Sequence, residues 1–421
     1  MVTYDLENTP IVDLVNKIIV AAVKARASDI HLDPIENGLK VRIRIDGVLR
    51  DHTVIPKEYE RNLTTRVKLI SNMNITETRL PQDGAIKGRI DGIDLDMRVS
   101  VLPTNEGEKV VIRILDYKRS LAGINSLGFS HKNYKKVEKM IQVPNGIILV
   151  TGATGSGKST TTYSILQDLN KEGTNIITVE DPIEMNIEGV NQVQVNSDIG
   201  LTFAHVLRSI LRQDPNIILI GEIRDSETAK IAVRASITGH LVLSTVHTNN
   251  SLSTIERLLD MDVERYLLSS ALTGIISQKL ARTLCPDCKR LRRTTIFEKH
   301  VFKEVLNKDV VEVYEPVGCP HCTNGYRGRH AIQEVLLIND EIQDAISNEN
   351  IRKEELKELV YKADVITLLQ DGLEKVLEGF TTFEEIYKLI EIEDGLDNQY
   401  GDILTKTKDN KEKEIELPVT E

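Results

Sequence analysis

Residues 152–160 read Gly-Ala-Thr-Gly-Ser-Gly-Lys-Ser-Thr, a glycine-rich stretch that ends in a lysine and two hydroxyl residues. The stretch follows the apolar run 146–150 and precedes the helix-compatible segment 161–169, which is the strand, loop and helix order of a phosphate-binding loop. Glycines there let backbone N–H groups point at phosphate oxygens, and the following helix adds its positive end. The stretch predicts nucleoside triphosphate binding; the alternative is a chance glycine-rich turn.

Two side chains of this loop have roles of their own. We expect Lys158 to reach the β- and γ-phosphates of ATP and the Ser159 hydroxyl to ligate Mg²⁺. The expected nucleotide contacts are Gly152, Ala153, Thr154, Gly155, Ser156, Gly157, Lys158, Ser159 and Thr160.

The bulk composition bounds the number of domains and the kinds of partner. A chain of 421 residues is too long for one simple core and predicts two or three domains. The formal net charge of -11 argues against the broad basic face that nonspecific nucleic-acid binding needs. Tryptophan is absent and aromatic residues make up only 4%, so platforms for stacking bases are scarce. We therefore expect no direct nucleic-acid contact.

Residues 11–23 form the longest apolar candidate for a membrane segment. Asp13, Asn16 and Lys17 interrupt it, and its apolar positions have the spacing of an amphipathic helix, which predicts a core-facing helix after Pro10. The N-terminus has neither the basic flank nor the apolar stretch of a signal peptide. We expect a cytoplasmic protein, whose four cysteines bind metal rather than form disulfides.

The pattern of strands and helices changes several times along the chain. Strand-like runs at 30–32, 39–45, 95–101 and 110–115, with a helical stretch at 59–72, predict an α+β domain over residues 1–118. A linker follows at 119–130. Short apolar strands at 147–150, 176–179, 217–220 and 241–246 alternate with helices over 131–280, which predicts an α/β domain with a parallel sheet. We expect a cysteine-bearing insertion at 281–330, a helical region at 331–393 and a flexible tail at 394–421.

Acidic side chains follow two of the predicted buried strands. Glu180, Asp181 and Glu184 come after the run 176–179, where carboxylates can hold a metal-bound water or accept its proton. Glu222 follows the run 217–220 and is the candidate metal-side acid, which acts on Mg²⁺ or on its water. A solvated acidic loop is the alternative for the first group, and a structural ion pair is the alternative for Arg224 and Asp225.

Two histidines, His240 and His247, flank the strand 241–246 together with threonines. They are either packing residues or groups that sense the γ-phosphate through hydrogen bonds.

Four cysteines form two pairs, each with two residues between its members. Cys285 and Cys288 make one pair, and Cys319 and Cys322 make the other. Two such knuckles supply the four thiolates of a tetrahedral Zn²⁺ site, and a redox dithiol is the alternative. Because four protein ligands leave no open position, we expect the zinc to be structural.

Taken together, these segments resemble the motor ATPases of type II secretion, type IV pilus assembly and DNA-uptake pseudopili. The resemblance is carried by the segments 27–33, 79–84, 152–160, 180–184, 221–222, 238–248, 285–288, 319–322, 325–329 and 378–385. It implies a RecA-like P-loop ATPase domain preceded by a PAS-like α+β domain, assembled as a homo-hexamer. The implied partner is an inner-membrane platform protein, through which the motor associates peripherally with the inner face of the plasma membrane.

The resemblance also assigns roles to residues. It implies Glu184 as the general base and Glu222 as the acid after the second strand, and His247 belongs to the same site. It implies arginines of the N-terminal domain that close over the nucleotide, for which Arg79 and Arg98 are the candidates. The nearby alternatives are Arg42, Arg44, Arg89 and Arg113. The cysteine pairs resemble assembly and secretion motors more than retraction motors.

The sequence favours the first of three functions. The first is an ATPase with Mg²⁺ that powers assembly of pilin-like subunits. The second is a nucleic-acid translocase or helicase-type motor with the same core, and the third is a nucleotide-gated scaffold that barely hydrolyses ATP.

Overall fold

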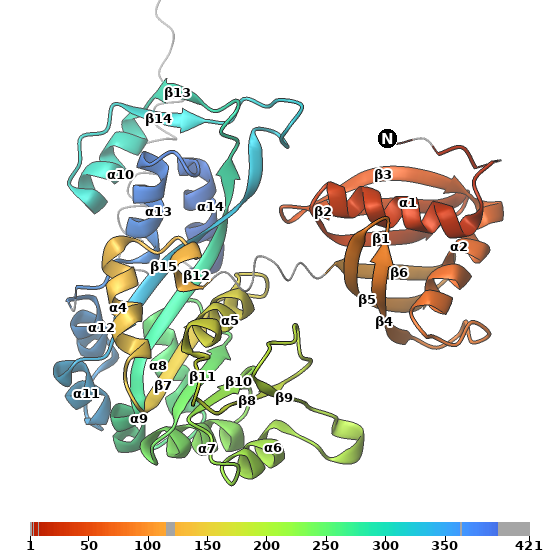
Figure 1. Ribbon diagram of the computed structural model, residues 1–421. Helices are drawn as coiled ribbons and strands as arrows, with labels where there is room; N and C mark the ends of the chain where they lie inside the picture. The colour runs from red at the N-terminus through yellow and green to blue at the C-terminus, as the bar shows by residue number, and fades with distance from the viewer. Residues whose placement is uncertain (1, 3, 7, 115–122, 363, 395–421) are drawn as a thin grey trace, which may run out of the picture. The chain divides into compact units, whose positions relative to one another are not determined.

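The computed structural model describes residues 2, 4–6, 8–114, 123–362 and 364–394 of the chain, which divides into two compact units, Met1–Tyr117 and Lys118–Glu421 (Figure 1). Each unit has its own buried apolar core. Most of the predicted tail, 395–421, and the first part of the predicted linker, 119–122, lie outside the described residues.

In its described residues, the first unit is a six-stranded sheet in the order β3-β2-β1-β6-β5-β4 with two helices, and every paired strand is antiparallel. Its elements are α1 (Ile11–Lys24), β1 (Ala27–Ile35), β2 (Gly38–Ile45), β3 (Val48–Pro56), α2 (Lys57–Ile70), β4 (Gln82–Ile90), β5 (Ile93–Thr104) and β6 (Gly107–Ile114). The apolar face of α1 is buried, as its spacing predicts, and it packs with α2 and the sheet into one core.

The second unit is built on a seven-stranded sheet in the order β15-β12-β7-β11-β10-β8-β9. Its first elements are η1 (Ile124–Ser126), α4 (His131–Ile141), β7 (Gly146–Thr151), α5 (Lys158–Leu169), β8 (Ile176–Glu180), β9 (Asn191–Gln194), η2 (Ser197–Ile199), α6 (Phe203–Ile210), β10 (Ile217–Ile220), α7 (Ser226–Ile237), β11 (Leu241–Val246), α8 (Ser251–Asp260), α9 (Arg265–Ala271), β12 (Leu272–Leu284) and β15 (Tyr326–Leu337). All neighbouring strands run parallel except the antiparallel pair of β12 and β15.

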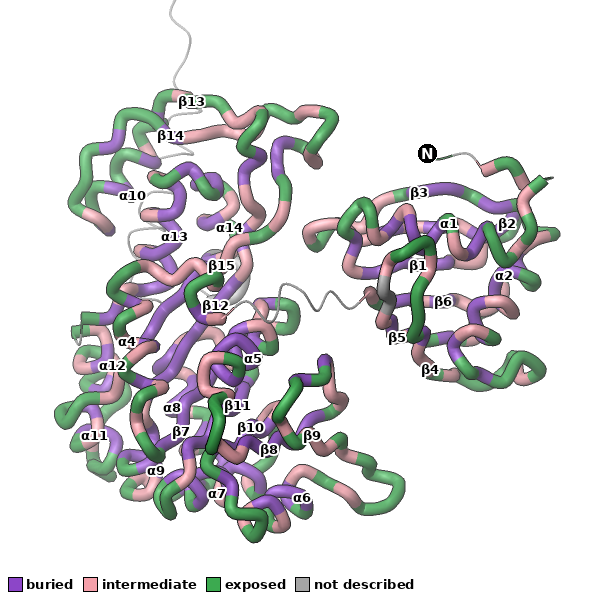
Figure 2. The backbone as a smooth tube through the Cα atoms, viewed as in Figure 1, coloured by how far each residue is buried: buried purple, intermediate pink, exposed green. Residues whose placement is uncertain are grey.

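Both faces of the central strands are covered. Alternate residues of β7, such as Ile147 and Leu149, belong to one core with α6, α7, α8 and α9, whereas the intervening Ile148 and Val150 are buried outside that core. Figure 2 shows these central strands as buried. Because β7, β8, β10 and β11 are parallel, the segments that follow them meet at one edge of the sheet.

The cysteine-bearing segment connects two strands of this sheet, β12 and β15. The sequence-based boundary at 280 falls inside β12, and the one at 330 falls inside β15. Between the two strands lie β13 (Arg290–Arg293), α10 (Ile296–Leu306) and β14 (Glu312–Glu315), and after β15 come α11 (Asp340–Ser347), α12 (Lys353–Lys362), α13 (Leu368–Leu377) and α14 (Phe383–Asp394). Phe302 of α10 packs into the same core as Leu373 of α13 and Phe383 of α14.

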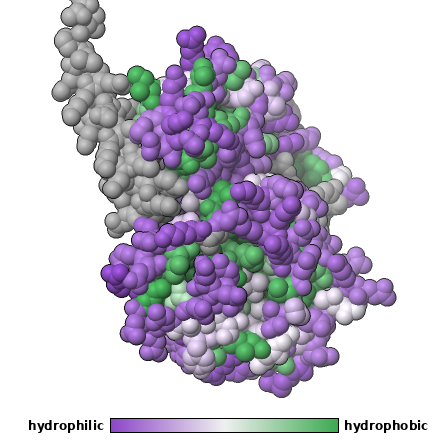
Figure 3. Space-filling model, turned by 90° about the vertical axis from the view of Figure 1, so that its left-hand side faces the viewer, coloured by the Kyte–Doolittle hydropathy of each residue, from purple (hydrophilic) through white to green (hydrophobic). Residues whose placement is uncertain are grey.

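On the face shown in Figure 3, hydrophobic residues form small patches separated by hydrophilic ones. No helix in the described part of the chain is both long and apolar enough to cross a membrane.

Candidate functional site

The glycine-rich loop connects β7 to α5, the order that its sequence predicts. β7 ends at Thr151 and α5 begins at Lys158. Gly157 has a φ of 91°, a left-handed conformation that glycine adopts without strain. A Cβ at Gly152 would lie 2.4 Å from the Gln278 carbonyl oxygen, so the loop needs a glycine there as well. The glycines are therefore required by the loop itself, before any ligand binds.

Lys158 lies within the loop rather than in solvent. Its side chain is buried, and Nζ donates hydrogen bonds to the carbonyl oxygens of Gly152 at 2.7 Å and Ala153 at 3.1 Å. Burial lowers the pKa of Lys158, and the nearby charge of Glu222 opposes that shift. The Ser156 hydroxyl oxygen is buried and has no hydrogen-bond partner among the described residues. A buried cation and an unsatisfied hydroxyl in one loop fit the oxygens of a phosphate group.

Gln278 of β12 holds this loop through hydrogen bonds, a role that its position in the sequence did not suggest. Its Nε2 donates to the Ser156 carbonyl oxygen at 2.8 Å, and its Oε1 accepts from the Thr161 hydroxyl at 2.8 Å. Thr151 makes a second contact across the sheet, because its hydroxyl donates to the Thr248 carbonyl oxygen at 2.6 Å. The loop is thus fixed to β12, and the end of β7 before it is fixed to the segment that follows β11.

Glu222 and His247 meet at the sheet edge that carries the loop. Glu222 follows β10 and His247 follows β11, and because these strands are parallel neighbours their ends coincide. His247 Nε2 lies 3.2 Å from Glu222 Oε2. Arg224 pairs with this carboxylate of Glu222, whereas the alternative had paired Arg224 with Asp225. Asp225 instead caps α7 by accepting from the backbone N–H of Thr228 at 2.8 Å.

Glu180 and Glu184 occupy different environments. Glu180 is buried and accepts hydrogen bonds from the hydroxyls of Thr178 and Tyr163 and from Gln192 Nε2. Glu184 is only partly buried, and its backbone N–H donates to the Tyr163 hydroxyl at 3.1 Å. Asp181 is exposed. The solvated-loop alternative therefore does not describe Glu180, whose carboxylate belongs to a buried network.

His240 lies at the other end of β11 from His247. Its Nδ1 is 2.9 Å from the Ala235 carbonyl oxygen, and it precedes the strand, so it lies at the edge opposite to the loop. The structure supports a packing role for His240 and does not support phosphate sensing.

The two candidate arginines belong to the first unit. Arg79 lies in the loop between α2 and β4, its side chain is 86% exposed, and it pairs with Glu77 at 3.1 Å. The carbonyl oxygen of Glu77 accepts from buried Lys68 at 2.6 Å, which anchors this loop to α2. Arg98 lies on β5, directly opposite Arg113 of β6. Both remain predictions as nucleotide contacts.

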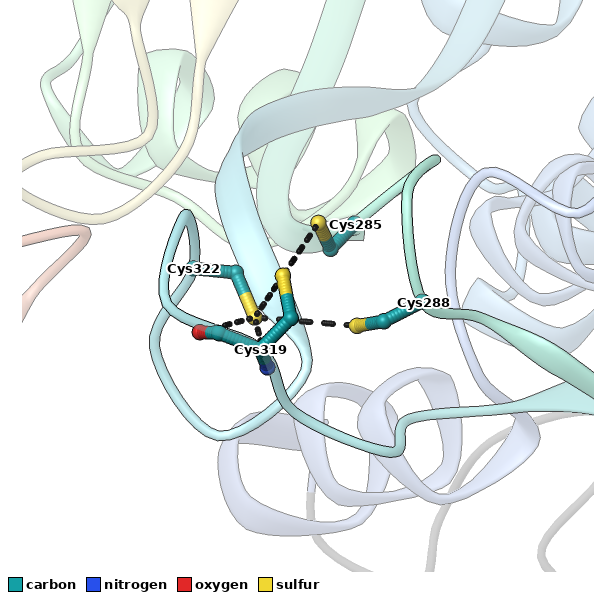
Figure 4. Close-up of side chains that lie close together, drawn as sticks. All are labelled: Cys285, Cys288, Cys319 and Cys322. Carbon is teal, nitrogen blue, oxygen red and sulfur yellow. Dashed lines mark hydrogen bonds between the residues drawn. The ribbon is translucent and has the colours of Figure 1, made fainter.

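The four cysteines come together at the ends of β12 and β15 (Figure 4). The Sγ atom of Cys319 lies 3.8 Å from Sγ of Cys285 and 3.6 Å from Sγ of Cys322. The Sγ atoms of Cys288 and Cys322 are 3.7 Å apart. A tetrahedral zinc with Zn–S bonds of about 2.3 Å implies sulfur separations of about 3.8 Å. The backbone N–H of Cys319 also donates to Cys322 Sγ at 3.2 Å. The donor set and its spacing fit zinc.

A glycine-rich loop between a parallel strand and a helix, with a buried lysine and a carboxylate at the same sheet edge, defines a P-loop nucleotide hydrolase with a RecA-like sheet. More specifically, the chain belongs to the type II/IV secretion system protein family, whose family model matches residues 5–388.

Individual relatives agree with this family. The type II secretion system ATPase E of Vibrio cholerae is 45% identical over 384 residues, which cover 91% of this chain and 76% of that protein. The type IV pilus assembly ATPase PilB of Myxococcus xanthus is 46% identical over 385 residues, 90% of this chain and 68% of that protein. The chain is therefore an ATP-hydrolysing enzyme of the secretion and pilus motor class.

Solved structures agree on the fold. The pilus retraction motor PilT with bound ADP gives a TM-score of 0.63 at 28% identity, covering 89% of this chain and 96% of that one. The ATPase DotB of Legionella pneumophila gives 0.68 at 20% identity, covering 90% and 95%, a likeness of fold alone. The predicted fold class is confirmed: an α/β RecA-like P-loop ATPase domain preceded by a PAS-like α+β domain, with a four-cysteine cluster and a helical C-terminal region.

Proposed function

We propose that this chain works as a homo-hexamer at the cytoplasmic face of the inner membrane, where ATP hydrolysis turns a platform protein that assembles pilin-like subunits. The observation that carries the proposal is the shared sheet edge of Lys158, Glu222 and His247, in a chain whose relatives are named as secretion and pilus-assembly ATPases. The cysteine cluster favours assembly or secretion over retraction, as the family resemblance implies.

The site residues divide the chemistry among them. Lys158 binds the β- and γ-phosphates, the amides of residues 152–160 bind the phosphate oxygens, and Ser159 ligates Mg²⁺. Bound Mg²⁺ neutralises charge on the phosphates. Glu184 accepts the proton of the water that attacks the γ-phosphorus, while the bond to the bridging oxygen breaks and ADP leaves. Glu222 would act on Mg²⁺ or on its water, and His247, whose Nε2 is 3.2 Å from Glu222 Oε2, would detect the γ-phosphate or its loss.

Arg79 and Arg98 complete the proposed site from the first unit. Their positive charges would close over the triphosphate while it is bound and let go of ADP and phosphate after hydrolysis, so each cycle would open and close the chain between its two units.

The cysteine cluster is proposed to hold a structural Zn²⁺ through Cys285, Cys288, Cys319 and Cys322. The support is the fit of the sulfur separations to a tetrahedron.

The roles of Lys158 and Glu184 predict different losses. We expect Lys158→Ala to weaken ATP binding and abolish turnover, because it removes the cation inside the loop. We expect Glu184→Gln to bind ATP as the parent chain does and to lose hydrolysis at least a hundredfold, since general base catalysis contributes about 10²–10⁴. Fluorescent-nucleotide titration and phosphate release measure the two quantities.

Exposed Glu188→Gln is the matched control, because it changes one carboxylate of the same loop at the surface. Normal turnover by Glu184→Gln would remove Glu184 as the base. Strong stimulation of phosphate release by single-stranded DNA would favour the nucleic-acid translocase instead, and a hexamer that releases no phosphate would favour the scaffold.

A further inference from the structure

The loop that carries Glu184 is tied to the helix that follows the phosphate-binding loop. Tyr163 lies on α5, five residues after Lys158, and only 3% of it is exposed. Its hydroxyl oxygen accepts a hydrogen bond from the backbone N–H of Glu184 at 3.1 Å. The same hydroxyl donates to the carboxylate of Glu180. One side chain therefore links the nucleotide helix, the end of β8 and the proposed base.

The carboxylate of Glu180 fixes the direction of the Tyr163 hydroxyl. It also accepts from the Thr178 hydroxyl at 2.5 Å and from Gln192 Nε2 at 3.0 Å. The backbone N–H of Glu184 can only donate, so the Tyr163 oxygen offers it a lone pair and the hydroxyl hydrogen points at Glu180. Burial, followed by the charge of Glu180, raises the pKa of Tyr163 and keeps its hydroxyl neutral.

Two glutamines hold the backbone on either side of the same loop. Gln192 accepts from the N–H of Ile187 at 2.8 Å and donates to the carbonyl oxygen of Met185 at 2.9 Å. Gln194 accepts from the N–H of Ile183 at 3.3 Å. These bonds hold residues 183, 185 and 187, and the bond from the Glu184 N–H to the Tyr163 hydroxyl relates residue 184 to α5.

We propose that Tyr163, oriented by Glu180, is a positioning residue that holds the Glu184 backbone in register with the phosphate-binding loop. The inference rests on the proposed role of Glu184 as general base. A base acts only within hydrogen-bond reach of its water, and misplacement of a reacting group by about 1 Å can cost about a hundredfold in rate. Because the Tyr163 hydroxyl joins α5 to the backbone of Glu184, a small shift of α5 would also move Glu184.

The experiment compares Tyr163→Phe with Tyr326→Phe in the full chain. Phenylalanine keeps the buried ring and removes only the hydroxyl, so we expect Tyr163→Phe to lower kcat about tenfold while the Kd for ATP changes by less than about twofold. Tyr326 is the matched control, since its buried hydroxyl bonds to Thr382 at 3.0 Å near the cysteine cluster. We expect Tyr326→Phe to leave kcat unchanged.

A double variant separates positioning from a general loss of packing. In a Glu184→Gln background, Tyr163→Phe should reduce the residual hydrolysis no further, because both changes act through the same proton acceptor. Glu180→Gln offers a second route, since it replaces the carboxylate that orients the hydroxyl and should lower kcat in the same direction. If Tyr163→Phe does not fold, Glu180→Gln decides the question.

The results distinguish the two ideas. Full turnover by Glu184→Gln would overturn both the base and the positioning role. An inactive Glu184→Gln together with a normal kcat for Tyr163→Phe, or for Glu180→Gln where it is decisive, would overturn the positioning role alone. A rise in the Kd for ATP as large as the fall in kcat, or an additive loss in the double variant, would also overturn it.

Discussion

Gln278 shows how a single side chain far along the chain shapes the phosphate-binding loop. It lies 122 residues after Ser156 and bonds to that residue's carbonyl oxygen. We expect Gln278→Ala to raise the Kd for ATP about five- to tenfold, because the loop loses its brace, and to lower the free energy of unfolding by about 1–3 kcal/mol, the cost of an unsatisfied buried group. Nucleotide titration and urea unfolding measure these two effects.

Exposed Gln213→Ala is the control for Gln278. An unchanged Kd for Gln278→Ala would show that the loop keeps its shape without this contact.

His330 makes stability depend on pH. Its ring stacks on Phe380 with centroids 4.5 Å apart, and burial, with a smaller effect of Lys375, lowers its pKa to about 4. A histidine in the unfolded chain has a pKa near 6.5, so between pH 6.5 and 4 the unfolded state binds the extra proton. His330 therefore contributes stability that is present above pH 6.5 and is lost as the pH falls toward 4, by at most about 1.4 kcal/mol per pH unit.

Replacing this histidine should flatten that dependence. We expect the free energy of unfolding of His330→Gln, from urea titrations at pH 7, 6 and 5, to fall less steeply than that of the parent chain. Exposed His300→Gln should follow the parent. A slope for His330→Gln equal to the parent slope would exclude His330 as the source.

Some residues of the candidate site stand out in the sequence because their neighbours form a motif. Lys158 belongs to a local pattern, and Glu222 and His247 each follow an apolar strand. Tyr163, Gln192 and Gln278 have no such signal, since their roles depend on contacts with segments brought near by the sheet. The two roles left open for His240 could not be separated for the same reason: the pattern shows that a histidine adjoins a strand but not which edge of the sheet that end occupies.

At the scale of elements, strands buried on both faces were predictable and edge strands were not. The runs 147–150, 176–179, 217–220 and 241–246 correspond to β7, β8, β10 and β11, because buried parallel strands are continuously apolar. β3 and β4 are the two edges of the first sheet, with charged residues and, in β4, two glycines, so their patterns are weak. β12 was missed altogether, since polar Ser277, Gln278 and Lys279 break its apolar pattern.

The cysteine cluster makes a prediction for the elements around it. We expect one Zn²⁺ per chain, and we expect chelation or Cys288→Ser to lower the thermal unfolding midpoint and to expose residues 285–322 to protease, because metal binding is coupled to folding. Elemental analysis, calorimetry and limited proteolysis measure these effects. Re-addition of Zn²⁺ should restore the chelated parent chain but not the variant, and a metal-free chain of undiminished stability would contradict a structural zinc.

In the whole molecule, Arg79 and Arg98 of the first unit are proposed to act on a nucleotide bound by the second unit. We expect Arg79→Ala and Arg98→Ala in the full chain to lower kcat at least tenfold, because removing a charge that stabilises the transferring phosphoryl group is costly. Exposed Arg61→Ala on α2 of the same unit should leave kcat unchanged.

The proposed hexamer makes a prediction of its own. Phosphate release per chain should rise with protein concentration as hexamers form, and sedimentation with ATP and Mg²⁺ can follow their formation.

Equal rates for all three arginine variants would remove Arg79 and Arg98 as the groups that close over the nucleotide. Arg113→Ala, directly opposite Arg98, would then be the next variant to measure.

The common core of α10, α13 and α14 limits how this enzyme can be re-engineered. Phe302, Val301 and Val313 from the cysteine-bearing insertion fill one side of a cluster that Leu373 and Phe383 complete. Excising the insertion to obtain a minimal motor would leave the apolar sides of the two terminal helices facing water. The cysteine-bearing insertion is therefore not an independent module. Transferring it to another protein requires transferring α13 and α14 with it.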